Sequence, residues 1–281
     1  MCPVPGRGGP GALSPQGVDA ISAYVLRSAA GTGRSAAAPG TRLPAVALHC
    51  AKSQRQALGG RGCGSGSGGQ RHRRRLRAGC GEPFGVDLAR AREVKAISAC
   101  TVARCGPLEV RLNNAAVGFS ETGRFPMASV GDTPEEAWDA ILAINPHGAA
   151  MACTHAIPVM VKQGGGGIVN LAATNARVAV PGADAYTAAT GGLVALTRVL
   201  ASDWGPQGIR VTCICPGAVD TPLIRGAAPP ERRDAALTRT TPIGRLAQPA
   251  AIARCSLFLA SSDASCLTGA IIPVDGGGTA R

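Results

Sequence analysis

The chain has 281 residues, of which 45% are hydrophobic, 16% charged and only 3% aromatic. This length and balance fit one globular domain, or one domain with an appendage, and exclude a coiled coil and a disulfide-rich miniprotein. The formal net charge of +12 is unevenly placed, because residues 1–80 hold 12 of the 29 Lys and Arg but a single acid, Asp19. Residues 81–281, with 17 basic and 16 acidic residues, are close to neutral.

The 11 cysteines form no CxxC pair and lie in no recognisable metal-ligand spacing with histidine. Cys213 and Cys215 lie two apart on an expected strand, so we expect them to share a buried face as core thiols. No apolar run approaches the roughly 18 residues that would suggest a membrane span, and the first residues lack the order of a secretory signal. These features predict a reduced, cytoplasmic protein with no membrane partner and no metal site.

Residues 1–80 contain 16 Gly and a run of arginines around position 73, with little periodicity that could bury an apolar face. We expect this segment to be largely disordered. Gly62, Gly66 and Gly68 could be interpreted as a phosphate-binding turn, but no apolar strand precedes them and a charge run follows. A basic arm for nucleic acid is an alternative, which the absence of aromatic residues interleaved with the arginines does not favour.

From Gly85 onward, short apolar segments alternate with amphipathic ones, a pattern typical of a parallel sheet covered by helices on both faces. We expect strands over residues 108–112, 168–172, 208–214 and 270–274, and helices over 183–204 and 249–260. Thr133-Pro134-Glu135-Glu136 predicts the start of a further helix, with a capping box and Pro at its first position. Polar residues and glycines gather where the strands end, which is where such sheets bind ligands.

Seven motifs follow one another over residues 85–277: VDL, LNNAA, the Asn of AINPHG, IVNLAA, AYTAAT, VTCICPGAVDTPL and IIPVDGG. In this order they resemble the short-chain dehydrogenase/reductase family. The resemblance implies an α/β fold with a Rossmann-like doubly wound parallel sheet over residues 81–281. It also implies NAD or NADP as cofactor, hydride transfer between a small carbonyl and an alcohol, and assembly into a homo-oligomer.

The resemblance assigns cofactor contacts to three of these motifs. Asp87 matches an acidic residue that bonds the adenine, and Asn113, Ala115 and Ala116 match a turn that passes the adenine ribose. A helix cap at Asp87 and a purely structural turn at Asn113 are the alternatives.

The third cofactor motif lies at the end of the expected strand 208–214. Pro216, Gly217 and Val219 match a turn whose backbone meets the nicotinamide carboxamide, and Thr221 matches a hydroxyl contact to the same group. An ordinary Pro-Gly turn is the competing interpretation.

The resemblance makes Tyr186 the general acid/base and gives Asn145 a place in the proton relay. The alternative for Asn145 is a purely structural role, in which its amide only satisfies helix carbonyls. Pro146, the next residue, would also bend the helix. A free phenol has a pKa of about 10, so about 0.1% is ionised at pH 7 unless a cation stabilises the phenolate.

Two catalytic positions of the family are changed in this chain. The lysine expected one helical turn after Tyr186 is Thr190, and the serine expected thirteen residues before it is Ala173. Thr190 brings no charge and Ala173 no hydrogen-bond donor, for which the hydroxyl of the adjacent Thr174 is the alternative source. We therefore predict an oxidoreductase of this family with impaired catalysis, and keep a non-catalytic Rossmann-like scaffold or weak nucleotide binder as the alternative.

The family's glycine turn should lie near residue 38, where Pro39 and Pro44 oppose the start of a helix. The composition then changes abruptly near residue 80. One hypothesis for this change is an altered reading frame upstream of that point in a GC-rich coding sequence.

We predict that limited proteolysis trims the chain toward a fragment that begins near residue 80, because only the later residues have periodic apolar faces. Mass spectrometry of the surviving fragment checks this prediction. Survival of an intact, protease-resistant N-terminal segment would contradict it.

Overall fold

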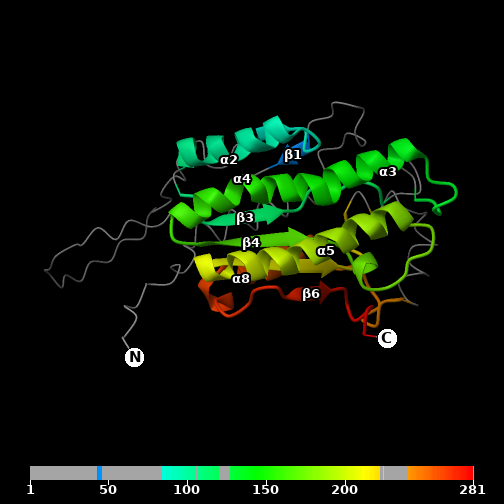
Figure 1. Cartoon of the computed structure of the whole chain (residues 1–281). Helices are drawn as coiled ribbons and strands as arrows, with labels where there is room; N and C mark the ends of the chain where they lie inside the picture. Colours follow the sequence, from blue (N-terminus) through cyan, green and yellow to red (C-terminus); the bar gives the residue numbers. More distant parts are fainter. Residues whose placement is uncertain are drawn as a thin grey trace, which may run out of the picture.

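A computed structural model describes residues 43–45, 84–105, 107–119, 127–221, 224 and 240–280. Its centre is a four-stranded parallel sheet in the order β3-β4-β5-β6 (Figure 1). The strands are β3 (Val110–Asn113), β4 (Gly166–Leu171), β5 (Ile209–Pro216) and β6 (Ile271–Val274). This confirms the α/β, Rossmann-like fold class.

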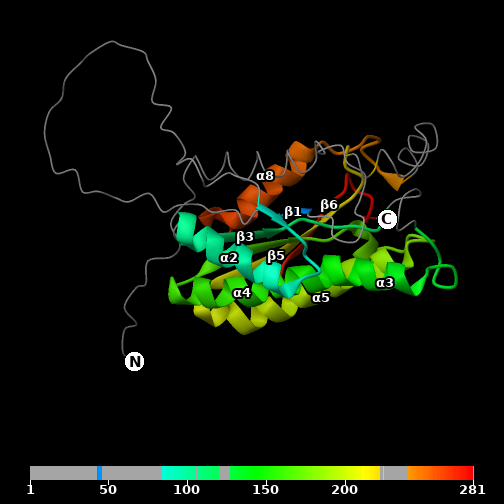
Figure 2. The same cartoon turned by 90° about the horizontal axis from the view of Figure 1, so that it is seen from above.

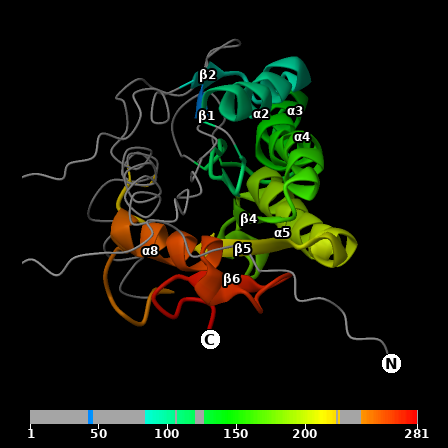
Figure 3. The same cartoon turned by 90° about the vertical axis from the view of Figure 1, so that its left-hand side faces the viewer.

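Helices cover both faces of the sheet, as Figures 2 and 3 show. One face carries α4 (Gly148–Lys162) and α5 (Asp184–Trp204), with α2 (Ala91–Cys105) packed on α4, and the other face carries α8 (Pro249–Ala260). The short helices are α3 (Glu135–Leu142), η1 (Ala143–His147), η2 (Thr174–Ala176), η3 (Gly205–Gln207) and η4 (Ser262–Ala264). The sheet is therefore doubly wound, as the alternating pattern predicts.

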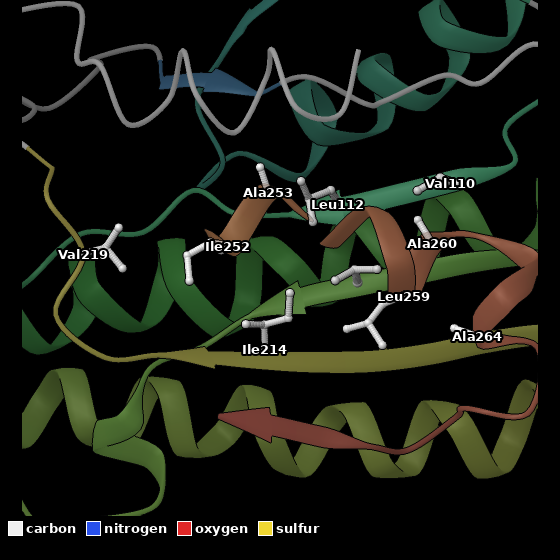
Figure 4. Packing of buried hydrophobic residues seen from close by; sticks show 10 residues of the cluster. Val110, Leu112, Ile214, Val219, Ile252, Ala253, Leu259, Ala260 and Ala264 are labelled. Carbon is white, nitrogen blue, oxygen red and sulfur yellow. The ribbon is translucent and has the colours of Figure 1, made fainter. Parts of the chain in front are cut away.

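The core is divided by the sheet into two layers because successive strand residues point to opposite faces. Val169 and Ile214 pack with α8 in a cluster that Figure 4 shows from close by. Their neighbours in sequence, Ile168 on β4 and Cys213 on β5, face the α4 and α5 layer. Cys213 and Cys215 are both fully buried in that layer, which confirms them as core thiols.

A second, two-stranded sheet joins β1 (Leu43–Ala45) to β2 (Phe84–Val86) in antiparallel pairing. β1 lies inside the segment that we expect to be disordered, so three of its residues are paired in a strand. The rest of residues 1–80, including Gly62, Gly66, Gly68 and the arginine run, lies outside the described residues. Disorder there, and a domain boundary near residue 80, stay predictions.

Most expected elements agree with the structure to within two residues, and the helix over 249–260 agrees at both ends. The capping box at Thr133 is wrong. The residue before α3 is Pro134, which has no side-chain oxygen, and the Thr133 hydroxyl donates instead to the carbonyls of Ala128 and Ser129. In the described part of the chain, no helix is long and apolar enough to cross a membrane.

The carboxyl end of α8 is capped by a guanidinium from the sheet. Arg210 on β5 donates to the carbonyl oxygens of Leu259 and Ala264 at 2.8 and 3.0 Å, and to those of Ser261 and Ala260 at 2.9 and 3.4 Å. Carbonyls at a helix end have no partner within the helix, and a cation there also complements the helix dipole. Arg210 therefore fixes α8 against the sheet.

Arg210→Ala is expected to lower the free energy of unfolding by about 2–3 kcal/mol, because it leaves these carbonyls without their charged donor. Urea denaturation followed by circular dichroism measures the loss. Arg254→Ala, on the exposed face of the same helix, serves as the matched control and should change it by less than about 0.5 kcal/mol. Equal losses in the two variants would show that the cap does not hold α8.

Candidate active site

The candidate site lies where β3, β4 and β5 end. The parallel register places Asn113 beside Asn170, and Asn170 beside Cys213, so the segments that follow these strands start next to one another. Ligands in parallel sheets bind beyond these carboxyl ends. The predicted cofactor residues on β3 and β5 are thus brought to one edge of the sheet.

A chain of buried polar side chains crosses the sheet below this edge. The Asn113 amide donates to Oδ1 of Asn170 at 2.8 Å, and the Asn170 amide donates to Oγ1 of Thr197 on α5 at 3.0 Å. Nε of Arg111 donates to Oδ1 of Asn113 at 2.8 Å. Buried amides are stable only when such partners are present. Asn113 is therefore held in place by the fold, whatever it contributes to a ligand.

A small cavity of about 20 Å³ opens at the end of β3, which is room for about one water molecule. It brings together four of the predicted site residues, Asn113, Ala115, Ala116 and Asn145, with Thr190 of α5. The other predicted residues do not line it: Asp87, Tyr186, Pro216, Gly217, Val219 and Thr221. The segment after β3, η1 and α5 therefore line one cavity.

Asn145 lies in a π-helical turn, η1, between α3 and α4, and Pro146 lies in the same turn. Its amide nitrogen donates to the Val117 carbonyl at 2.8 Å, and its amide oxygen accepts from the Val117 N–H at 2.9 Å. The side chain thus holds the segment after β3 and donates to no helix carbonyl. The alternative of an amide that only satisfies helix carbonyls is therefore wrong. π-helical turns occur frequently at functional sites. A role for Asn145 in proton transfer stays a prediction.

Tyr186 occupies the first turn of α5 and is 7% exposed. Its ring centroid lies 5.2 Å from that of Phe119, in the segment that Asn145 clamps. Burial, followed by the negative charge of Cys215, raises the pKa of Tyr186 to about 12. The Cys215 pKa itself is lowered, chiefly by a hydrogen bond from Cys213. Tyr186 is therefore a protonated phenol at neutral pH.

Positions 173 and 190, where the resemblance implies a hydrogen-bond donor and a cation beside Tyr186, provide neither group. The Thr190 hydroxyl is buried and donates to the backbone carbonyls of Tyr186 and Thr187 at 3.0 and 3.2 Å. Ala173 ends the segment after β4 and carries no polar atom in its side chain. Burial raises the pKa of Tyr186, and Thr190 brings no charge that would lower it again.

Asp87 follows β2 and takes part in the turn that opens α2. Its carboxylate accepts from the Ala89 N–H at 3.0 Å and pairs with Nε of Arg90 at 3.2 Å, while its own N–H donates to Glu93 at 2.9 Å. The carboxylate thus stabilises the turn before α2 and does not cap the helix itself, which begins at Ala91 with the Arg90 carbonyl as its first acceptor. Contact of Asp87 with adenine stays a prediction.

The segment after β5 is fixed by backbone contacts. The Gly217 N–H donates to the Val274 carbonyl at 3.1 Å, and Val219 forms a bridge with Ala247. A Cβ at position 217 would lie 2.8 Å from the Cα of Asp275, so glycine is needed for this approach. Oγ1 of Thr221 accepts from the Ile224 N–H at 3.4 Å. These contacts fix the turn at the end of β5, and its contact with nicotinamide stays a prediction.

The comparisons with known proteins agree with this geometry. A family model described as enoyl-(acyl carrier protein) reductase matches residues 66–279. 2-(R)-hydroxypropyl-CoM dehydrogenase from Xanthobacter autotrophicus Py2 is 36% identical over 195 residues, which cover 69% of this chain and 76% of that protein. The chain belongs to the short-chain dehydrogenase/reductase family.

Two further members of the family bear on the site. A protein from the same bacterium, named inactive 2-(S)-hydroxypropyl-CoM dehydrogenase 2, is 36% identical over 202 residues, covering 70% of this chain and 84% of its own. The crystal structure of levodione reductase superposes with a TM-score of 0.64 at 27% identity, covering 69% of this chain and 76% of that one. The family match begins at residue 66, upstream of the boundary expected at residue 80.

Sequence reasoning missed the partners of the predicted residues. Asn170 and Thr197 complete the polar chain of Asn113, and Phe119 covers the ring of Tyr186. The polar chain could have been suspected from Asn170, a polar residue inside an apolar strand. The contact of Phe119 had no local signal, because it joins segments 67 residues apart in the numbering.

Thr190→Lys is expected to lower the pKa of Tyr186 from about 12, because an ammonium beside the phenol stabilises the phenolate. Alkaline titration of the phenolate absorbance measures this, with Tyr186→Phe used to subtract Tyr24. Ala188→Lys adds the same charge on the exposed face of α5 and is the control. If the Thr190 and Ala188 variants give the same pKa, the absent cation is not what keeps Tyr186 protonated.

Proposed function

We propose that this protein is an oxidoreductase that transfers a hydride between NAD(P)(H) and a small carbonyl or alcohol substrate, at a low rate. Its membership of a family of oxidoreductases supports the type of reaction. The observation that supports a low rate is the environment of Tyr186. Its phenol is buried, and Thr190 stands one helical turn away where the family has lysine. The site keeps the proton donor of the family and lacks both of its usual aids.

The residues at the strand ends fit the nucleoside parts of a nicotinamide dinucleotide. Ala115 and Ala116 present small side chains at the end of β3, which allows close approach to the backbone. We propose that Asp87, Asn113, Ala115 and Ala116 contact the adenosine half, and that the turn of Pro216, Gly217, Val219 and Thr221 contacts the nicotinamide. When bound, the cofactor supplies or accepts the hydride. We propose that the dinucleotide lies along the strand ends, because the cavity has room for only about one water molecule.

Tyr186 provides the proton in carbonyl reduction. At neutral pH it is fully protonated, so it donates to the forming alkoxide, while the reverse reaction needs a phenolate that is rare at its raised pKa. General acid/base assistance is typically worth 10²–10⁴-fold and a polarising donor a further 10²–10³-fold. A site with an unassisted phenol is therefore slow in both directions.

A nucleotide-binding scaffold without catalysis is the second candidate. It is favoured by the joint replacement of serine and lysine by Ala173 and Thr190, and by the similarity to a family member named inactive. The two candidates share the fold and the cofactor surface. They differ in whether hydride transfer occurs.

We further propose that the folded unit comprises residues 81–281, that it assembles as a homo-oligomer and that it acts in the cytoplasm. Val199 on α5 and Phe258 on α8 are 55% and 45% exposed, which supports contact with another copy at one or both helical faces. Six of the seven cysteines in the described ranges are free thiols, which supports a reducing compartment.

The deciding experiment titrates NADH and NADPH by fluorescence and then measures turnover. The substrates are levodione, small methyl ketones and 2-(R)-hydroxypropyl-CoM, with the matching cofactor form. We expect binding with turnover below about 0.1 s⁻¹, at least 10²-fold under the usual enzyme value of about 10 s⁻¹.

Tyr186→Phe should abolish the residual turnover and leave cofactor binding in place. Binding without any turnover selects the scaffold. Turnover near 10 s⁻¹ would show that Ala173 and Thr190 have been fully compensated, and would overturn the proposed slow rate.

A further inference from the structure

Four asparagines are buried in the described part of the chain, and one of them differs from the rest. Asn113, Asn145 and Asn170 each have both amide atoms in hydrogen bonds. Asn175 is 7% exposed, and its Nδ2 is buried with no hydrogen-bond partner. It is the one described buried asparagine that is left with an unused donor.

An unused buried donor destabilises a folded protein, because the group has lost water and gained nothing in exchange. Each such group in a native structure calls for an explanation, of which a role toward a ligand is one. Oγ1 of Thr187, the residue that follows Tyr186, is a second buried polar atom without a hydrogen-bond partner. Two of the unpartnered polar atoms therefore belong to the elements that carry the catalytic set.

Asn175 lies close to the position where that set is incomplete. It is in the middle of η2, which starts directly after Ala173 at the end of the β4 segment. η2 packs against α5, the helix that begins with Tyr186 in its first turn. A donor is therefore missing at Ala173 and is present, unused, two residues later on the same turn.

We propose that Asn175 is a catalytic residue whose Nδ2–H donates to the reacting oxygen of the substrate, in place of the hydroxyl that Ala173 lacks. The inference rests on the proposed function. In reduction, the carbonyl carbon gains the hydride and its π electrons move to oxygen, which takes the proton of Tyr186 to give the alcohol. Water then reprotonates the phenolate. The amide keeps its own proton and lowers the energy of the charge that develops on oxygen.

A neutral amide in this role suits a neutral carbonyl oxygen. It requires no ionised group on the substrate next to the reacting carbon. The substrate is then a neutral carbonyl compound or the corresponding alcohol, whose oxygen receives one hydrogen bond from Asn175 and one proton from Tyr186.

The test compares Asn175→Leu with the wild-type full chain. Leu has nearly the shape of Asn and removes the unused amide, so Tm without ligand should stay equal or rise by about 2–4 °C. Turnover with the ketone panel and reduced cofactor should fall about 10²-fold, mainly in kcat. Thr212→Val, which removes another unpartnered buried group on β5, is the control and should leave turnover unchanged.

Ala173→Ser completes the design. Added to Asn175→Leu, it should restore turnover to the wild-type rate or above, whereas added to the wild type it should change turnover by less than about threefold. A fall in Tm of more than about 4 °C for Asn175→Leu would show a structural role and overturn the proposal. If the wild type turns over and Asn175→Leu turns over at the same rate, the proposal for Asn175 is also overturned, while the proposed function stands. If the wild type and every serine variant bind cofactor without turnover, the proposed function fails and this inference with it.

Discussion

The hydrogen bond between the buried amides of Asn113 and Asn170 is the contact on which the site depends. It joins the last residue of β3 to the next-to-last residue of β4, and Asn170 continues the connection to α5 through Thr197. Because both amides are buried, breaking this bond would deprive Oδ1 of Asn170 of its donor and leave Nδ2 of Asn113 with the weak acceptor Sγ of Cys153 at 3.5 Å. β3 and α5, the helix that carries Tyr186, are thus held in fixed positions relative to β4.

Much of the fold is readable from local sequence because its elements follow local rules. The helix Pro249–Ala260 has Pro in its first turn, and the strand Ile209–Pro216 is an apolar run that ends in a Pro-Gly turn. The start of α3 is not readable in this way. Thr133 has the residue type and spacing of a cap, yet its hydroxyl bonds back to the preceding turn, a choice that sequence spacing does not encode.

In the candidate site, too, local sequence predicts some features, and others depend on segments that are distant in the chain. Motif order gives the positions of Asn145, Tyr186 and Thr190 along the chain, and the structure places Asn145 on η1 and the other two on α5. Burial is different, because it depends on segments that are distant in sequence. The raised pKa of Tyr186 comes from its surroundings and from Cys215 on another element, and the unpartnered amide of Asn175 appears only when every neighbour is known.

The clamp between Asn145 and Val117 affects how any mutagenesis of this site is interpreted. It ties together residues 28 apart, and the segment that it holds includes Phe119, which lies against the ring of Tyr186. A replacement at Asn145 would release this segment and let the phenol move, with no proton transfer involved. Loss of activity in an Asn145 variant would therefore measure the position of Tyr186 as much as any chemistry of the amide.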